Sequence, residues 1–351
     1  MHEFVYEQPA RRVIFGVGSL SRLPEEVKRL GQRALVLSTP EQRQDAENVS
    51  RRLGGLSVGV FANAVMHVPV EVARAAREHA KARGADVYVA LGGGSTIGLG
   101  KAIALETSNP ILAIPTTFAG SEMTPIYGLT EGGLKRTARD NRVLPKTVIY
   151  DPTLTLTLPA RIAGPSGMNA LAHCVEALYA PDGNPIVSLM AGEAIRALAR
   201  SLPFVVGEPA NVEARADALY GAWLAGISLG ATSMSLHHKL CHTLGGTFNL
   251  AHADVHTVIL PHATAYNSGA APAAMRAIAD ALGATNAAQG LYDLAGRIGA
   301  PRALKDIGMP ADGLDKAADL AMQNPYFNPQ PLERSTIRQL LEDAYQGTRP
   351  A

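Results

Sequence analysis

Cysteine is scarce in this sequence, which has two cysteines among 351 residues. Two cysteines exclude a disulfide scaffold and a cysteine-rich zinc module, and they fit a reducing compartment. No run of about 18 apolar residues occurs, so we expect no membrane span. The first residues contain no apolar stretch of the kind that marks a secretory signal. We therefore predict a cytoplasmic protein without a membrane partner.

An excess of charge of one sign is also absent. Lys and Arg total 32 and Asp and Glu total 31, which gives a formal net charge of +1. Because nucleic-acid-binding surfaces are usually basic, we expect no nucleic-acid partner. Hydrophobic residues make up 47% of the chain, which is enough to bury the cores of two domains.

Short apolar segments alternate with amphipathic ones in the first part of the chain. Strand-like segments lie at 13–15, 34–37, 58–61, 87–91 and 111–114, and residues 123–150 resemble a β-hairpin that ends in a strand. Helical patterns lie between them at 21–31, 41–53 and 70–83. This alternation predicts an α/β domain over residues 1–155 with a mainly parallel, Rossmann-like sheet.

The amino-acid composition changes after Asp151-Pro152, and Ala and Leu dominate the following residues. Apolar residues recur at helical spacing through 160–203, 212–245, 253–267, 272–284, 287–298 and 331–346. This spacing predicts an all-α domain over residues 156–351, with the boundary between the two domains near 151–162.

A glycine-rich turn follows the strand pattern at 87–91. Gly92-Gly93-Gly94-Ser95 stands between that strand and an apolar helix, where backbone N–H groups and the helix dipole favour a phosphate. A plain tight turn is the alternative, although it needs only one or two glycines. Neither common fingerprint is present, because Ile97 replaces the last glycine of G-x-G-x-x-G and Ala102 stands where a P-loop has Ser or Thr.

A second polar turn follows the strand pattern at 111–114 and contains Thr116 and Thr117. Turns at the carboxyl ends of neighbouring parallel strands converge on one ligand crevice, so these hydroxyls are candidates for binding a pyrophosphate or ribose. The alternative is a turn in which each hydroxyl bonds its own backbone.

Histidines cluster in the predicted helical domain, where six of the ten lie within residues 237–262. His238 and His242 are four residues apart and share a helix face, as do Asn169 and His173. Three histidines and an oxygen ligand suit Fe or Zn, but the amide of Asn169 binds such ions less well than a carboxylate. The two cysteines each adjoin a cluster histidine, and neighbours on a helix diverge by about 100°. We therefore interpret both cysteines as core residues.

Five motifs occur in an order that resembles the iron-containing alcohol dehydrogenase family. They are GGGS (92–95), PTTFAGSE (115–122), VIYDPTLTLTLP (148–159), GMNALAH (167–173) and HHKLCHTLGGTFNLAH (237–252). The segments 92–104, 237–246 and 324–331 are similar to the maleylacetate reductase branch of that family. The resemblance covers nearly the whole chain and implies the fold shared with dehydroquinate synthase, with an active site in the cleft between the two domains.

The resemblance also implies a cofactor, a substrate and a set of site residues. NADH or NADPH would bind at Gly92, Gly93, Gly94, Ser95, Thr116, Thr117, Thr124, Ser38 and Lys135. A dicarboxylate substrate would contact Asn169, His237 and Lys239. The metal-ligand positions of the family fall on Asn169, His173, His238 and His252, where Asn replaces the usual Asp, and Gly98 replaces a second Asp. We interpret these four residues as a vestigial ligand set and expect a homodimer.

The implied reaction converts 2-maleylacetate to 3-oxoadipate in bacterial breakdown of aromatic compounds. Hydride would add to the alkene carbon β to the ketone, which requires an enolate-stabilising donor, a proton source and partners for two carboxylates. We predict that His173, His238, His242 and His252 are catalytic, with His242 as the first candidate for the proton donor.

The residues leave three other functions open: a metal-dependent alcohol dehydrogenase of the same family, a dehydroquinate-synthase-like lyase and a non-catalytic nucleotide sensor. Metal analysis separates the first from a metal-independent reductase, and Asn169 argues against the second because that enzyme needs a full ligand set. A histidine cluster beside a cofactor crevice argues against the third.

Overall fold

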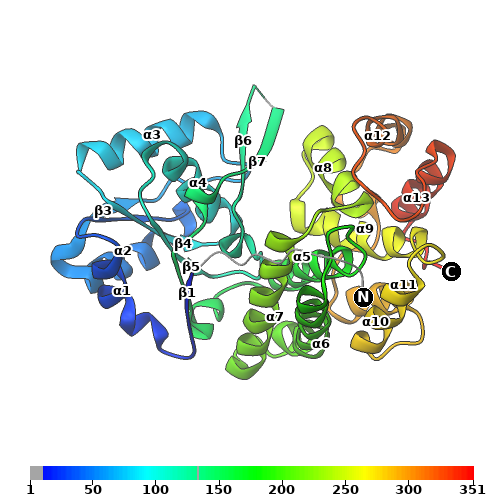
Figure 1. The fold of residues 1–351 in the computed structure, drawn as a ribbon, viewed down its shortest axis with the longest axis horizontal. Coiled ribbons are helices and arrows are strands. Elements are labelled where there is room, and N and C mark those ends of the chain that lie inside the picture. Colours follow the sequence, from blue (N-terminus) through cyan, green and yellow to red (C-terminus); the bar gives the residue numbers. More distant parts are fainter. Residues whose placement is uncertain (1–10, 133) are drawn as a thin grey trace. The chain divides into compact units, whose positions relative to one another are not determined.

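The computed structural model describes residues 11–132 and 134–351, which form two compact units divided between Thr157 and Leu158 (Figure 1). The first is a sheet unit and the second is a helical unit. Within the described residues, no helix is both long and apolar enough to cross a membrane.

The sheet unit is built on six parallel strands in the order β1-β8-β5-β4-β2-β3. Their bounds are β1 Arg12–Phe15, β2 Ala34–Leu37, β3 Ser57–Phe61, β4 Val87–Gly92, β5 Ile111–Pro115 and β8 Thr147–Tyr150. A separate antiparallel hairpin consists of β6, Ile126–Glu131, and β7, Leu134–Arg139. The predicted parallel sheet is confirmed, and each strand-like segment of the sequence forms a strand.

Helices cover both faces of this sheet (Figure 1). The four α-helices are α1 Leu23–Leu30, α2 Arg43–Leu53, α3 Val70–Ala82 and α4 Gly94–Thr107. Val27 and Val49, from α1 and α2, share a buried core with Val36 and Val89 of the sheet. Because side chains alternate across a strand, the neighbouring residues Leu37 and Ala90 face α4 on the other side, where Gly100 allows the helix to approach closely.

The strands β2 and β4 are neighbours in the sheet, and the chain leaves them toward opposite edges of the sheet. From β2 the chain proceeds outward to the edge strand β3, and from β4 it proceeds the opposite way to β5. Ligands in open α/β sheets bind at such a switch point, beyond the carboxyl ends of the strands. The glycine-rich turn after β4 therefore lies at the expected binding edge of this unit.

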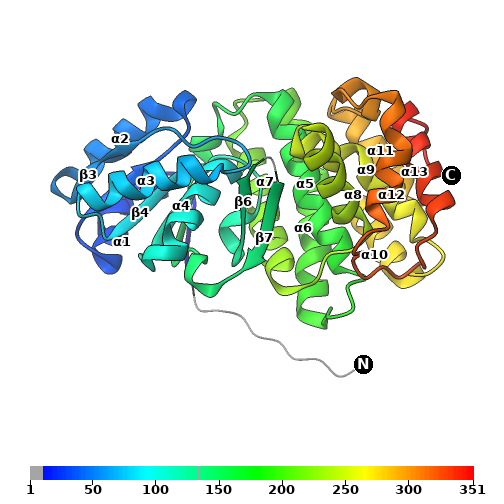
Figure 2. The same ribbon diagram turned by 90° about the horizontal axis from the view of Figure 1, so that it is seen from above.

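The helical unit contains nine α-helices within its described residues. They are α5 Ala160–Ala177, α6 Pro185–Gly207, α7 Val212–Ala231, α8 Leu236–Phe248, α9 His252–Tyr266, α10 Pro272–Leu282, α11 Ala287–Arg297, α12 Leu314–Ala321 and α13 Arg334–Gln346. Buried residues of α8, α9, α12 and α13 form one core, and Figure 2 shows these four helices together. The all-α architecture predicted for this part of the chain is confirmed.

Two long helical patterns of the sequence are interrupted in the structure. The pattern at 160–203 breaks into α5 and α6, because Asn184 caps the second helix by accepting a bond from Val187 N at 3.1 Å and Pro185 starts it. The pattern at 212–245 breaks at Thr232–Ser235, between α7 and α8. The short helix α12 lies outside every predicted segment.

Candidate functional site

The helices α5, α8 and α9 bring the histidine cluster together within the helical unit. Asn169 and His173 lie one turn apart on α5, which begins at Ala160 and contains Pro165 rather than starting after it. His238 and His242 lie one turn apart on α8, and His252 opens α9. The spacing argument from the sequence thus placed the pairs on shared helix faces.

A chain of close polar contacts runs through this cluster. Asn169 Nδ2 lies 3.4 Å from His173 Nε2, and His173 Nδ1 lies 3.0 Å from His238 Nε2. His238 Nδ1 lies 2.6 Å from Glu176 Oε2. Every member is at most 5% exposed, so these contacts are made away from bulk water.

Glu176 was missed in the sequence, although it is the carboxylate of the site. It stands three residues after His173 on α5 and accepts from the backbone N–H groups of Ser235 and His237, each at 2.8 Å. It therefore caps the start of α8, where a negative charge is favourable. The signal available in the sequence was an acidic residue within an otherwise apolar helix, one turn from a cluster histidine.

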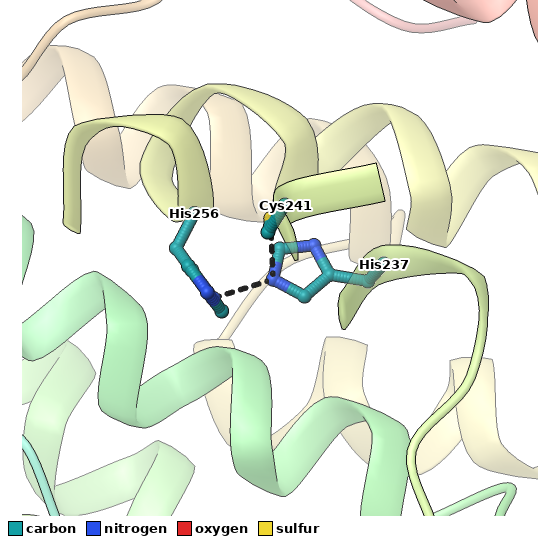
Figure 3. Close-up of side chains that lie close together, drawn as sticks. All are labelled: His237, Cys241 and His256. Carbon is teal, nitrogen blue, oxygen red and sulfur yellow. Dashed lines mark hydrogen bonds between the residues drawn. The ribbon is translucent and has the colours of Figure 1, made fainter. Parts of the chain in front are cut away.

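A second group of side chains consists of His237 and Cys241 on α8 and His256 on α9 (Figure 3). His237 Nε2 is 2.9 Å from His256 Nδ1 and 3.6 Å from Cys241 Sγ. Burial is the main cause that lowers the pKa of both histidines well below the usual range, so both rings are neutral at neutral pH. His237 has no exposed surface, and its ring centroid lies 5.2 Å from that of His238, so we revise its assignment from substrate contact to a supporting position beside His238.

The remaining predicted residues form a less buried rim. His242 Nδ1 lies 3.2 Å from the hydroxyl of Tyr326, and the rings of His242 and His252 stack with centroids 6.4 Å apart. Lys239 donates to the carbonyl of Gln323 at 2.6 Å, and its ammonium lies 5.8 Å from the Tyr326 ring centroid. The motif at 324–331 thus contributes Tyr326, which the sequence argument had not assigned.

The residues at the family's metal-ligand positions form a weak donor set for a metal ion, because one of the four is the amide Asn169. The ring nitrogens of His238 lie within hydrogen-bond distance of Glu176 and His173. His237, Cys241 and His256 have ligand atoms within 4.8 Å of one another. However, their nitrogens share a hydrogen bond, and burial raises the pKa of the thiol well above its usual range.

In the sheet unit, the glycine-rich turn has the geometry of an anion site. Gly92 ends β4 with a φ of 148°, and Gly94 begins α4. A Cβ on Gly93 would lie 2.8 Å from Thr117, whereas a Cβ on Gly94 would meet no atom within 4 Å. Gly94 therefore leaves open space in front of the N-terminus of a helix, where N–H groups attract phosphate.

The turn after β5 joins this edge, as the sequence predicts. Thr116 N donates to the carbonyl of Gly92 at 3.2 Å, and Gln42 Nε2 donates to Thr116 Oγ1 at 3.0 Å. Ser95 and Thr117 are half-buried and lie at the same edge. Gln42, which the sequence argument missed, ties the turn after β2 to the turn after β5.

Two predicted cofactor ligands have other partners. Ser38 is fully buried, and its hydroxyl donates to the carbonyl of Thr39 at 3.1 Å. Thr124 is also buried, and its hydroxyl accepts from the ammonium of Lys101 at 3.1 Å. We therefore revise both assignments from direct ligands to supporting residues. The side chain of Lys135 lies outside the described residues.

The chain combines an α/β unit that has a glycine-rich strand–helix turn with a helical unit that has clustered histidines. Residues 10–152 match the model of iron-containing alcohol dehydrogenases, and residues 164–345 match the model of the family's C-terminal part. The chain belongs to the iron-containing alcohol dehydrogenase family and is an oxidoreductase.

Within the family, the chain is similar to several maleylacetate reductases and, at lower identity, to a 1,3-propanediol oxidoreductase. A maleylacetate reductase from Burkholderia cepacia is 61% identical over 352 residues, with 100% of each chain covered. One from Sphingobium indicum is 56% identical over 348 residues, with 99% of each covered. The crystal structure of maleylacetate reductase from Agrobacterium tumefaciens has a TM-score of 0.96 at 54% identity, covering 100% of each chain. A 1,3-propanediol oxidoreductase structure has a TM-score of 0.92 at 27% identity, covering 98% of this chain and 100% of its own.

Proposed function

We propose that this protein reduces the carbon–carbon double bond of 2-maleylacetate with NADH or NADPH and forms 3-oxoadipate. The full-length identity of 61% to a maleylacetate reductase is the observation that carries the proposal. The helical unit supports it, because its histidines, Lys239 and Tyr326 offer hydrogen-bond donors suited to a dicarboxylate and a ketone.

The reaction makes three demands on these residues. Hydride from the nicotinamide adds to the alkene carbon β to the ketone, and the electron pair of the double bond moves to form an enolate. Donors must stabilise the enolate oxygen, and a proton must reach the carbon next to the ketone. We assign enolate and carboxylate binding to His173, His238 and His252, and proton transfer to His242.

His242 suits proton transfer because of its position on the rim of the cluster. It is half-buried, whereas His173 and His238 are almost fully buried. Its Nδ1 lies 3.2 Å from the Tyr326 hydroxyl, and this contact orients the ring. Burial raises the pKa of Tyr326, which keeps its hydroxyl protonated at neutral pH.

The cofactor proposal rests on the sheet unit. Gly92, Gly93, Gly94 and Ser95 would hold the pyrophosphate, with Thr116 and Thr117 at the neighbouring turn. The chain after β2 has no carboxylate until Glu41, and a carboxylate there would repel a 2′-phosphate. We therefore propose that both NADH and NADPH serve, with a preference below about 1000-fold, or about 4 kcal/mol.

We propose that the reaction needs no iron or zinc, because the amide of Asn169 supplies no negative charge at the family's metal-ligand positions. Two free, buried cysteines fit the proposed location in a reducing cytoplasm. The homodimer and the role in aromatic breakdown remain proposals that the resemblance supports.

Oxidation of NADH or NADPH in the presence of maleylacetate tests the proposed function. We expect turnover that survives treatment with a chelator, and little turnover of short alcohols or diols. Efficient oxidation of an alcohol, with no activity on maleylacetate, would instead identify an alcohol dehydrogenase. Loss of turnover on metal removal and recovery on metal return would show that Asn169 coordinates an ion through its carbonyl oxygen.

A further inference from the structure

The segment 324–331, which we call the strap, connects α12 to α13 without forming a helix or a strand. None of its side chains is buried, and Phe327 is 50% exposed, so the hydrophobic effect contributes little to its position. Among the described residues, no backbone-to-backbone hydrogen bond holds the strap. The strap nevertheless carries Tyr326, whose hydroxyl lies 3.2 Å from His242 Nδ1. Its position must therefore depend on bonds from side chains.

The side chain of Asn267, at the end of α9, makes three such bonds to the strap. Its Nδ2 donates to Asn328 Oδ1 at 3.0 Å, and its Oδ1 accepts from Asn328 Nδ2 at 2.7 Å. The same Oδ1 also accepts from Gln330 N at 3.3 Å. Asn267 has no exposed surface, so these bonds stand in for water at a fully buried amide.

The backbone of Gln330 fixes the orientation of both amides. Gln330 N can only donate, so it requires the oxygen of Asn267, and the Gln330 carbonyl can only accept, from Asn328 Nδ2 at 2.7 Å. The two amides thus form a closed set of donors and acceptors that includes no titratable group. An aspartate in place of Asn267 would lack the N–H that Asn328 Oδ1 accepts, and an apolar side chain would leave Asn328 without either bond.

Further bonds hold the chain at both ends of the strap. Tyr266, the last residue of α9, donates its hydroxyl to the carbonyl of Pro331 at 2.7 Å. Just before the strap, the carbonyl of Gln323 accepts from Lys239 Nζ of α8 at 2.6 Å. Tyr326 therefore lies between an anchor on α8 and an anchor on α9.

We propose that Asn267 is a positioning residue that holds Tyr326 against His242 through the strap. The proposal rests on the proposed function, which assigns proton transfer to His242. Tyr326 is only two residues from Asn328, and each residue spans at most about 3.6 Å, so the Tyr326 ring cannot keep its place if the anchor moves away. A displacement of about 1 Å at a reacting centre can lower a rate by about 100-fold. A buried amide that touches no histidine of the cluster thus supports turnover.

Hydrogen–deuterium exchange of the full-length protein without substrate measures the anchor itself. In Asn267→Ala, peptides that cover residues 324–333 should exchange at least about 10-fold faster, because Gln330 N–H loses its acceptor and the strap loses its hold. Asn286→Ala is the matched control, since it removes an asparagine side chain that caps α11 by accepting from Gln289 N at 3.0 Å. That control should leave exchange of the strap unchanged. Wild-type exchange of the strap in Asn267→Ala would overturn the proposal.

Kinetics show whether the anchor acts through Tyr326. Asn267→Ala should lower kcat on maleylacetate by at least about 10-fold and leave the KM for the cofactor unchanged. Tyr326→Phe removes the hydroxyl that contacts His242 and should cause a loss of similar size. In the double variant, Asn267→Ala should add less than about 3-fold to the loss in Tyr326→Phe, because both changes act on one contact. Losses that multiply would show that Asn267 supports only the fold, and they would reject its positioning role.

The outcomes separate this proposal from the proposed function. A wild type inactive on maleylacetate would reject the function together with the catalytic role of the anchor, whereas exchange would still decide whether Asn267 holds the strap. An active wild type with a normal kcat in Asn267→Ala would preserve the function and reject the positioning role. If Asn267→Ala does not fold, Asn328→Ala removes the same pair of amide bonds from the half-buried side and should give the same changes in exchange and kcat. Wild-type exchange and a wild-type kcat in that variant would contradict the proposal.

Discussion

The two units differ in the chemical groups that they offer to the proposed ligands. The sheet unit offers backbone N–H groups and open space, as Gly94 shows at the start of α4. The helical unit offers side chains that hold one another, as His173, His238 and Glu176 show. A backbone site depends on conformation and on the absence of side chains, whereas a side-chain site depends on protonation and on mutual contacts. Substitutions should therefore affect cofactor binding in the sheet unit, and substrate binding and proton transfer in the helical unit.

The largest effect is expected at His242. His242→Ala should lower kcat by roughly 10²–10⁴-fold while cofactor binding is retained, because a positioned proton donor contributes about that much. His173→Ala and His238→Ala should mainly raise the KM for maleylacetate. Steady-state kinetics with both substrates varied separates the effects on kcat from the effects on KM. His79→Ala, a histidine of the sheet unit beside Phe61, serves as the control. An unchanged kcat in His242→Ala would show that another group donates the proton, and Tyr326 would be the first candidate.

Gly94→Val should weaken cofactor binding by at least about 10-fold, or about 1.4 kcal/mol, without unfolding the protein. The Cβ of the new side chain meets no protein atom within 4 Å, so the substitution should act on the proposed ligand space. Titration of NADH fluorescence gives the dissociation constant directly. Gly55→Val, at an exposed glycine of the same unit that is also free of neighbours, should bind normally. Normal binding by Gly94→Val would place the pyrophosphate elsewhere.

Asn169→Asp should change the helical site from a hydrogen-bonded chain toward a metal site. The substitution adds a negative charge beside His173 and removes the amide donor that contacts it. Carboxylate and imidazole together bind Zn²⁺ or Fe²⁺ far better than amide and imidazole. Metal content after loading and desalting should rise in the variant but not in Asn184→Asp, a substitution at a helix cap distant in sequence. Equal metal content in wild type and Asn169→Asp would contradict this account of the site.

The smallest expected effect concerns stability, at a histidine that is not assigned to the site. Burial lowers the pKa of His262 to about 4, so between pH 6.5 and 4 the unfolded chain binds a proton there that the folded chain does not. Its contribution to stability is therefore lost as the pH falls through this window, with a slope of at most about 1.4 kcal/mol per pH unit. His262→Gln, measured by urea unfolding, should show a shallower pH dependence than wild type. The same pH dependence of the free energy of unfolding in the variant and the wild type would contradict burial of His262 as its cause.

The contrast between a backbone site and a side-chain site also explains how much of each unit could be predicted from the sequence. The strands, the parallel sheet and the glycine-rich turn were predictable, because apolar runs and glycines fix local conformation. In the helical unit the spacing predicted shared faces for Asn169 with His173 and for His238 with His242, but not which faces meet. Glu176 and Tyr326 were missed because their importance comes from contacts between segments distant in the chain.

Burial was the other quantity that spacing could not supply. His237 and His242 both belong to the cluster in sequence, yet one is fully buried and neutral and the other lies on the rim. Likewise, Ser38 and Thr124 are polar residues near predicted turns, but their hydroxyls are bonded to the protein itself. Residue type identifies candidates, and only packing decides which candidates can face a ligand.

The position of a transferred deuterium tests the central claim most directly. With maleylacetate and a nicotinamide cofactor deuterated at its hydride position, we predict deuterium at the carbon that was β to the ketone. The carbon next to the ketone should carry a proton from solvent, and the ketone itself should survive. Deuterium on a newly formed carbinol carbon would contradict the account, since it would show carbonyl reduction of the alcohol dehydrogenase type.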